Sequence, residues 1–153
     1  MKLLLDIDGV MVSTSPWKRP DFLSDGFPVF SAKATLALNR LLEETQSTIV
    51  LTTSHKSSHT ISEWISIFQR RGIEINSLDR LPENTTHLNR QEEILNWLNE
   101  QKSLDSFIIL DDDKSLNDLP VSIKKNLLQT SAMIGLTETL VDEFLTKQEL
   151  VVA

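Results

Sequence analysis

Two short apolar runs, each followed directly by aspartates, constrain the fold of this chain more than any other feature. The first is KLLLDID at residues 2–8, and the second is FIILDDD at residues 107–113. A short, continuous apolar run is typical of a strand that is buried on both faces of a parallel sheet. The sequence therefore predicts two buried strands that both end in carboxylates.

Helix and strand patterns alternate along the rest of the chain. Thr60 and Glu63 have the spacing of a capping box, and Gly72 marks the end of the helix that the box opens. Apolar spacing predicts helices at about 32–44, 60–72, 89–102 and 137–147, and short apolar runs predict further strands at about 48–51, 73–78 and 126–130. This alternation predicts a three-layer α/β fold with a mostly parallel central sheet.

The chain has the length and composition of one globular domain. Its 153 residues, 40% of them hydrophobic, are enough to bury a core, so we expect a single domain over residues 1–153. Prolines and glycines interrupt the periodic pattern at about residues 10–31, which predicts a short ordered flap after the first strand. The absence of cysteine excludes disulfides and thiolate metal sites.

Charge and hydropathy limit the partners that we expect. The net charge of −7 argues against broad electrostatic binding to nucleic acid, because that binding depends on Lys and Arg neutralising phosphates. Asp6 and Asp8 interrupt the N-terminal apolar run before it reaches the length of a signal peptide, and no segment has the length of a membrane span. We therefore expect a cytoplasmic protein without a membrane partner, and the sequence gives no indication of its oligomeric state.

The carboxylates at the two strand ends predict a metal site. The carboxyl ends of parallel strands meet at one edge of the sheet, where ligands bind. Asp6 and Asp8 are two residues apart and project to the same side of an extended strand, and Asp111, Asp112 and Asp113 follow the second strand. Neighbouring carboxylates repel one another unless a cation neutralises them. An all-oxygen set suits Mg²⁺, which proteins commonly use to bind phosphate.

The same residues suggest a division of chemical work. A carboxylate can attack phosphorus to form an aspartyl-phosphate, while a second carboxyl protonates the leaving oxygen and later activates water. Asp6 and Asp8 are candidates for these two roles. Thr52, at a strand end, and Arg90, at a helix start, are candidates for binding the charged phosphoryl oxygens.

Four segments resemble, in order, the motifs of the haloacid dehalogenase-like (HAD) superfamily. They are DIDGV at 6–10, IVLTTS at 49–54, LNRQEEILNWL at 88–98 and FIILDDD at 107–113. With GLTETLVDEFL at 135–145, the pattern resembles the HAD domains of Swiss-army-knife RNA repair proteins and their stand-alone relatives. The resemblance implies a Rossmann-like HAD fold, essentially without a cap domain, and a magnesium-dependent phosphatase activity.

The resemblance also implies roles for individual residues. Asp6 is the nucleophile, Asp8 the acid/base, and Thr52 the phosphate-binding residue of the second motif, with Thr53 as its alternative. Arg90 replaces the lysine that is common in the third motif, and Lys56 and Lys114 are alternatives to it. The implied substrate-binding residues are Gly9, Thr52, Thr53 and Arg90. The implied metal ligands are Asp6, the backbone carbonyl of Asp8, and Asp112 or Asp111.

Some residues have a simpler interpretation. His55, His59 and Glu63 have the spacing of a helical metal face, but they straddle a helix start, so we do not expect them to bind metal. Trp64 and Trp97 lie on apolar helical faces and are expected in the core. Trp17 lies in the flap, where an aromatic ring can stack on a substrate base or sugar.

Three functions fit the sequence. The first is a phosphatase for a small phosphorylated metabolite or nucleotide. The alternatives are a polynucleotide end-processing phosphatase in RNA or DNA repair, and a non-catalytic metal-binding interaction module of the same fold. Binding of a polymer would be supported if the following basic residues gathered on one rim of the site: Lys18, Arg19, Lys56, Arg70, Arg71 and Arg90.

Overall fold

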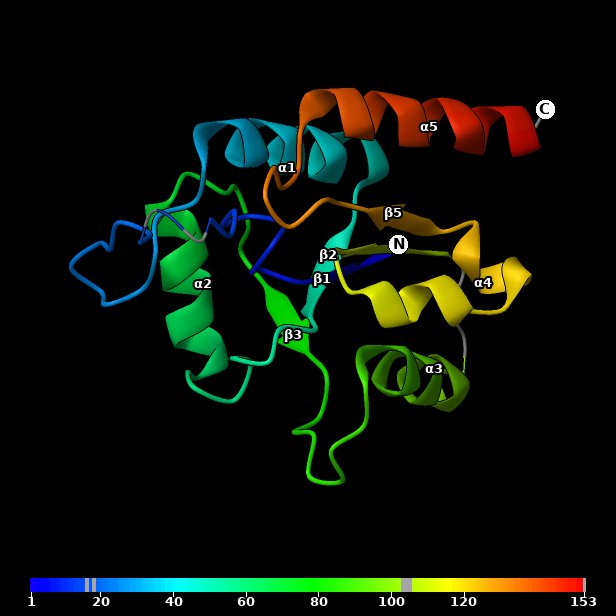
Figure 1. Cartoon of the computed structure of the whole chain (residues 1–153), viewed down its shortest axis with the longest axis horizontal. Helices are drawn as coiled ribbons and strands as arrows, with labels where there is room; N and C mark the ends of the chain where they lie inside the picture. Colours follow the sequence, from blue (N-terminus) through cyan, green and yellow to red (C-terminus); the bar gives the residue numbers. More distant parts are fainter. Residues whose placement is uncertain (16, 18, 103–105, 153) are drawn as a thin grey trace.

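The central feature of the fold is a five-stranded sheet in which every neighbouring pair of strands is parallel (Figure 1). The computed structural model describes residues 1–15, 17, 19–102 and 106–152. The strands are β1 (Lys2–Leu5), β2 (Thr48–Leu51), β3 (Leu78–Arg80), β4 (Phe107–Asp111) and β5 (Leu127–Gln129), in the order β3-β2-β1-β4-β5. The predicted α/β class is confirmed, with an entirely parallel sheet.

The central strands are buried on both faces, as their continuous apolar runs predict. Successive side chains of a strand point to opposite faces of the sheet. Leu3 and Leu5 accordingly belong to the larger apolar core cluster, whereas Leu4 between them belongs to a second cluster on the other face. Both faces of β1 therefore need helices to cover them.

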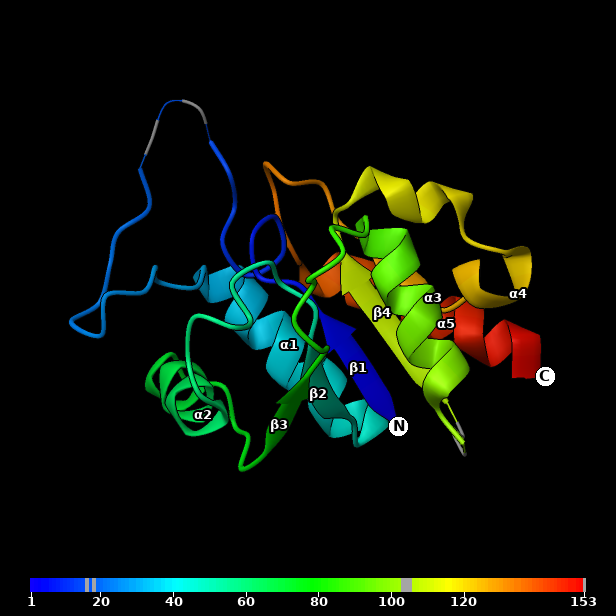
Figure 2. The ribbon, with the colours of Figure 1, turned by 90° about the horizontal axis from the view of Figure 1, so that it is seen from below.

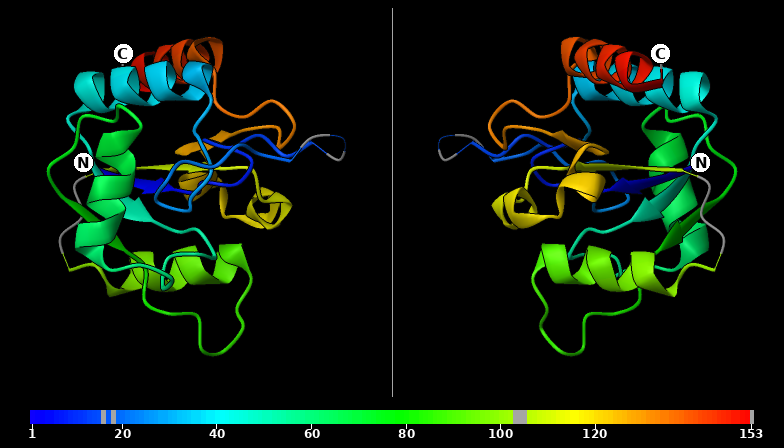
Figure 3. Two further views of the ribbon diagram at one scale, coloured as in Figure 1. Left: turned by 90° about the vertical axis from the view of Figure 1, so that its left-hand side faces the viewer. Right: turned by 90° about the vertical axis from the view of Figure 1, so that its right-hand side faces the viewer.

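Helices cover the two faces of the sheet (Figure 3). The larger cluster includes side chains from α1 (Ala32–Thr45), α2 (Ile61–Arg70) and α5 (Glu138–Val152). The second cluster includes side chains from α3 (Arg90–Glu100), the 3₁₀ helix η1 (Lys114–Asp118) and α4 (Val121–Lys124). These layers confirm the three-layer arrangement, and Trp64 of α2 is fully buried in the larger cluster, as predicted.

The helix starts follow their capping residues. Thr60 and Glu63 form the predicted capping box of α2, and Asn89 and Glu92 form a second one at the start of α3. In both boxes the side chains accept hydrogen bonds from backbone N–H groups that would otherwise lack partners. Arg90 therefore occupies the first helical position of α3.

Two expectations are wrong in detail. The third strand begins at Leu78, because Ile73 instead donates its backbone N–H to Phe68 O at the end of α2 and packs into the core as part of a turn. Trp97 is only half-buried, since it lies against the second cluster at its margin. In the described part of the chain, no helix combines the length and the apolar character needed to cross a membrane.

The segment between β1 and α1 forms the expected flap, which projects from the carboxyl edge of the sheet (Figure 2). Its base is fixed by Arg71, whose guanidinium donates to the Asp25 carboxylate at 2.7 and 2.8 Å and to the carbonyls of Phe27 and Pro28. The guanidinium also lies over the Phe27 ring, 5.5 Å from its centroid. The side of the flap that faces α2 is therefore anchored to it.

Candidate active site

The residues at the carboxyl ends of β1, β2 and β4 converge as predicted. Asp6 follows β1 and donates its backbone N–H to Leu110 O at 3.0 Å, which continues the pairing with β4. Thr52 follows β2 and donates its N–H to Leu5 O at 2.9 Å. Asp111 is the last residue of β4. The sheet itself thus fixes the backbone of all three residues.

Three carboxylates form a cluster at this edge. Oxygens of Asp6, Asp111 and Asp112 lie within 4.8 Å of one another, and the first two residues are buried. Asp113 lies outside the cluster, because its carboxylate accepts the N–H of Ser115 and caps η1. Of the three consecutive aspartates, the structure therefore brings Asp111 and Asp112 to Asp6.

Gly9 makes room for this cluster. A Cβ atom at Gly9 would lie 2.1 Å from Oδ2 of Asp112, and the residue has a φ of +81°, which side chains disfavour. The hydroxyl of Thr130 donates to Gly9 O at 2.7 Å and holds the turn in place. The role that the structure shows for Gly9 is thus to let the backbone pack closely against the Asp112 carboxylate.

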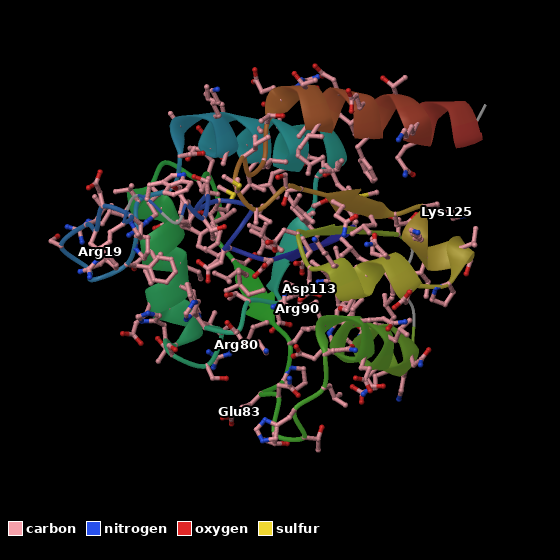
Figure 4. All side chains as sticks on the ribbon, viewed as in Figure 1. Arg19, Arg80, Glu83, Arg90, Asp113 and Lys125 are labelled. Atoms are coloured by element: carbon pink, nitrogen blue, oxygen red, sulfur yellow. The ribbon has the colours of Figure 1, made fainter. Side chains whose placement is uncertain are left out.

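Arg90 reaches into the cluster from the start of α3. Its Nη1 lies 2.6 Å from Oδ2 of Asp111 and 3.4 Å from Oδ1 of Asp6, and it donates to the Thr52 hydroxyl at 3.2 Å. Figure 4 shows Arg90 in the middle of the molecule, near the start of α3. The predicted residues Asp6, Thr52, Arg90 and Asp111 are therefore in direct contact.

The electrostatics of the cluster favour an additional cation. Burial, followed by the charge of Asp111, raises the pKa of Asp6 to about 8, although Arg90 opposes this shift. Burial also raises the pKa of Asp112. One guanidinium does not balance three carboxylates, and the donor atoms are all oxygens. This set fits a hard divalent cation such as Mg²⁺.

A buried ion pair supports Arg90 from behind. Nζ of Lys56 lies 2.9 Å from Oε2 of Glu93, and Oε1 of Glu93 lies 3.8 Å from Nε of Arg90. Lys56 is thus neutralised by Glu93 rather than by the clustered carboxylates, and Lys114 is an exposed residue at the start of η1. Of the three candidates for the basic residue, Arg90 is the one in contact with the cluster.

Asp8 has a different environment from Asp6. Its side chain is 49% exposed, and its Oδ2 lies 2.9 Å from Nε2 of His55. Among the described residues, the acidic side chains close enough to share a cation do not include Asp8. The sequence did not indicate this His55 contact, although His55 closely follows Thr52 on the loop after β2.

Of the remaining candidates, Thr52 contacts the cluster, whereas Thr53 and His59 have other partners. Oγ1 of Thr52 lies 3.4 Å from Oδ2 of Asp111, whereas Oγ1 of Thr53 accepts the N–H of His55. His59 packs against Phe27 and Trp64 and does not join His55 in a metal face.

The basic residues do not gather on one rim. Lys56, Arg71 and Arg90 are each paired with carboxylates, and Arg70 lines a hollow between α2 and Asp25 of the flap. Arg19 lies on the flap, well away from Arg90 in Figure 4, and Lys18 lies outside the described residues. The rim that would support binding of a nucleic-acid polymer is therefore not formed by the described members of this set.

Comparison with known proteins assigns most of the chain to one family. No curated protein and no solved structure matches the chain. Residues 2–141 match the family described as the HAD domain in Swiss Army Knife RNA repair proteins. This match covers all five strands and the whole acidic cluster, so the chain belongs to that HAD family.

Proposed function

We propose that this protein is a magnesium-dependent phosphohydrolase that uses Asp6 as its nucleophile. The observation that carries the proposal is the contact of Arg90 with Asp6 and Asp111 inside a cluster of three carboxylates at the carboxyl edge of the sheet. HAD domains are usually phosphohydrolases, and the chain belongs to a HAD family. A buried carboxylate beside a fixed cation is suited to attack on a phosphoryl group.

The proposed metal ligands are the side chains of Asp6, Asp111 and Asp112, with the backbone carbonyl of Asp8 as a further ligand. When bound there, Mg²⁺ would neutralise the charge of the carboxylates and of the phosphoryl oxygens. Thr52 and Arg90 would donate hydrogen bonds to the same phosphoryl oxygens. Gly9 and Thr53 are proposed as substrate-binding residues because they lie on the loops that border the cluster.

The reaction divides into two balanced steps. In the first, a carboxylate oxygen of Asp6 forms a bond to phosphorus, the ester P–O bond breaks, and Asp8 gives its proton to the leaving oxygen. In the second, water attacks phosphorus, Asp8 takes the proton of that water, and the bond to Asp6 breaks to release phosphate. Asp8 suits this exchange because its carboxyl is accessible to solvent.

A small phosphorylated metabolite or a nucleotide is the substrate class that we propose first. The arrangement of the basic residues supports it, because a polymer needs a continuous basic surface. Arg71 and Arg90 are paired with carboxylates, and Arg19 lies on the flap away from Arg90 in Figure 4. A phosphorylated RNA or DNA end is the second candidate, and the link of the family to RNA repair supports it. A panel of metabolite, nucleotide and oligonucleotide phosphates separates these classes.

The test compares turnover of an aryl phosphate with Mg²⁺ by the natural protein, by Asp6→Asn and by Asp118→Asn. Asp118 is an exposed aspartate on η1 and controls for the loss of one carboxylate elsewhere. We expect Asp6→Asn to abolish turnover and Asp118→Asn to retain it. Equal rates for Asp6→Asn and the natural protein would contradict the proposal. Magnesium binding without turnover of any phosphate would instead favour the non-catalytic module.

A further inference from the structure

The backbone of Asp8 is fixed, but its carboxylate is not held by the sheet. Asp8 forms an isolated bridge with Val12, and the turn around it is closed by the N–H of Gly9, which donates to Val12 O at 2.8 Å. The side chain is 49% exposed, unlike that of Asp6. The orientation of the Asp8 carboxylate therefore depends on whichever side chain contacts it.

His55 provides that contact. Its Nε2 lies 2.9 Å from Oδ2 of Asp8, and within the described residues it is the side chain at hydrogen-bonding distance from this carboxylate. When Nε2 of His55 carries a proton, it donates that proton to Oδ2 of Asp8, and Oδ1 of Asp8 takes no part in this hydrogen bond. Such a contact fixes the rotation of the carboxyl group and leaves its other oxygen free to carry the proton that is transferred.

His55 is itself held in place by its loop. Its N–H donates to the Thr53 hydroxyl at 3.3 Å, and its ring lies edge-on to Phe27 of the flap, with centroids 6.4 Å apart. The next residue, Lys56, accepts hydrogen bonds at its carbonyl from the Trp64 indole at 3.0 Å and from Arg80 at 2.7 Å. The loop therefore presents the His55 ring to Asp8 in a fixed place.

We infer that His55 is a positioning residue that orients the Asp8 carboxyl group for proton transfer to the leaving oxygen. The inference rests on the proposed function, because Asp8 is the acid in that reaction. In the first step the Asp6–phosphorus bond forms, the ester P–O bond breaks, and the proton moves from Asp8 to the departing oxygen. His55 exchanges no proton with the substrate and acts only through the direction of the Asp8 carboxyl group.

The test uses two aryl phosphates that differ in how much their leaving oxygens need a proton. Phenyl phosphate releases a basic oxygen that needs protonation, whereas 2,4-dinitrophenyl phosphate releases a stable anion that does not. We expect His55→Ala to lower kcat/KM for phenyl phosphate by about tenfold and to change kcat/KM for the dinitrophenyl ester by less than about twofold. Asp8→Asn should show the same selectivity with a larger loss.

Two further variants separate positioning from folding. His55→Gln keeps a side-chain N–H donor and should restore most of the phenyl phosphate activity that His55→Ala loses. His59→Ala removes the neighbouring histidine, which packs on Phe27 and Trp64 and not on Asp8, and should lower both activities equally or not at all. Without substrate or metal, ¹⁵N shifts of the His55 ring should show a proton on Nε2, and these shifts should change in Asp8→Ala.

The outcomes distinguish this inference from the proposed function. Equal losses on both esters, or no loss in His55→Ala, would overturn the role of His55 while leaving the phosphohydrolase proposal intact. No turnover of either ester by the natural protein, with Mg²⁺ present, would overturn the proposed function and the inference together.

Discussion

Nη1 of Arg90 lies 2.6 Å from Oδ2 of Asp111, although the two residues belong to the start of α3 and the end of β4. Asp111 is fully buried, so a guanidinium at this distance offsets part of the cost of burying its charge, together with the N–H of Asp113, which donates to Asp111 Oδ1. The position depends on Asn89, whose capping box sets the first turn of α3 and thereby the place from which Arg90 projects. Helix capping and the electrostatics of the site are thus linked.

Replacing Arg90 by lysine should impair catalysis more than folding. Lysine keeps the charge but has no planar guanidinium to contact Asp111, Asp6 and Thr52 together. We expect kcat/KM to fall by about a hundredfold, the usual loss for removing one donor to a developing charge. The control is Arg40→Lys, which changes a half-buried arginine of α1 that is paired with Glu44 and Asp142, away from the cluster. Equal activity of Arg90→Lys and the natural protein would contradict a role for the guanidinium.

The charge of Asp6 should make the metal-free protein less stable as the pH rises. The pKa of Asp6 is raised to about 8 in the folded chain and is about 3.9 in an unfolded one. Between these values the folded protein retains a proton that the unfolded chain has lost, so the free energy of unfolding falls with increasing pH. Asp6→Asn should remove this part of the decline. Urea unfolding with a chelator at pH 5, 6.5 and 8 measures the free energy of unfolding of both proteins. The same decline with pH in Asp6→Asn and in the natural protein would contradict the raised pKa of Asp6.

The sequence predicts those strands and helices that are determined by the pattern of neighbouring residues. The runs before Asp6 and Asp111 are continuous and apolar, which favours strands buried on both faces of a parallel sheet, and the structure confirms both. The start of α3 followed from its helical periodicity. The pattern predicts a strand from Ile73, but the turn after α2 gives this residue a buried position without strand pairing.

The contacts of the site were only partly predictable. That Asp6 and Asp111 meet follows from parallel strands ending at one edge, which needs no side-chain detail. The pairs His55–Asp8 and Lys56–Glu93 join a loop to another element, so their partners depend on the path of the loop after β2. A histidine and a lysine at these positions are common on exposed loops, and spacing alone carries no signal of their partners.

The ion pair at the base of the flap should stabilise the protein only above acidic pH. The hydrogen bonds from Arg71 hold the pKa of Asp25 well below its usual range. A lowered carboxyl pKa contributes stability that is present above the unfolded value of about 3.9 and is lost as the pH falls toward the folded value. Asp25→Asn should therefore be less stable than the natural protein at pH 7, and this difference should shrink at pH 3. Urea unfolding of both proteins at pH 7 and pH 3 tests this prediction. If Asp25→Asn were destabilised equally at the two pH values, the ion pair with Arg71 would not be the source of the destabilisation.

Gly9 and Gly26 provide a matched pair that separates backbone strain from disruption of the acidic cluster. Their φ angles are +81° and +80°, so the backbone strain of an alanine is similar at the two positions, about 1–2 kcal/mol of folding stability. Their surroundings differ, because a Cβ at Gly26 would have no atom within 4 Å, whereas a Cβ at Gly9 would lie 2.1 Å from Asp112 Oδ2. Gly9→Ala must therefore displace the Asp112 carboxylate from Asp6 and Asp111. We expect both variants to lose stability in urea unfolding, but only Gly9→Ala to lose Mg²⁺ affinity in calorimetric titration, by about tenfold. Equal Mg²⁺ affinity in the two variants would show that Asp112 does not contribute to the metal site.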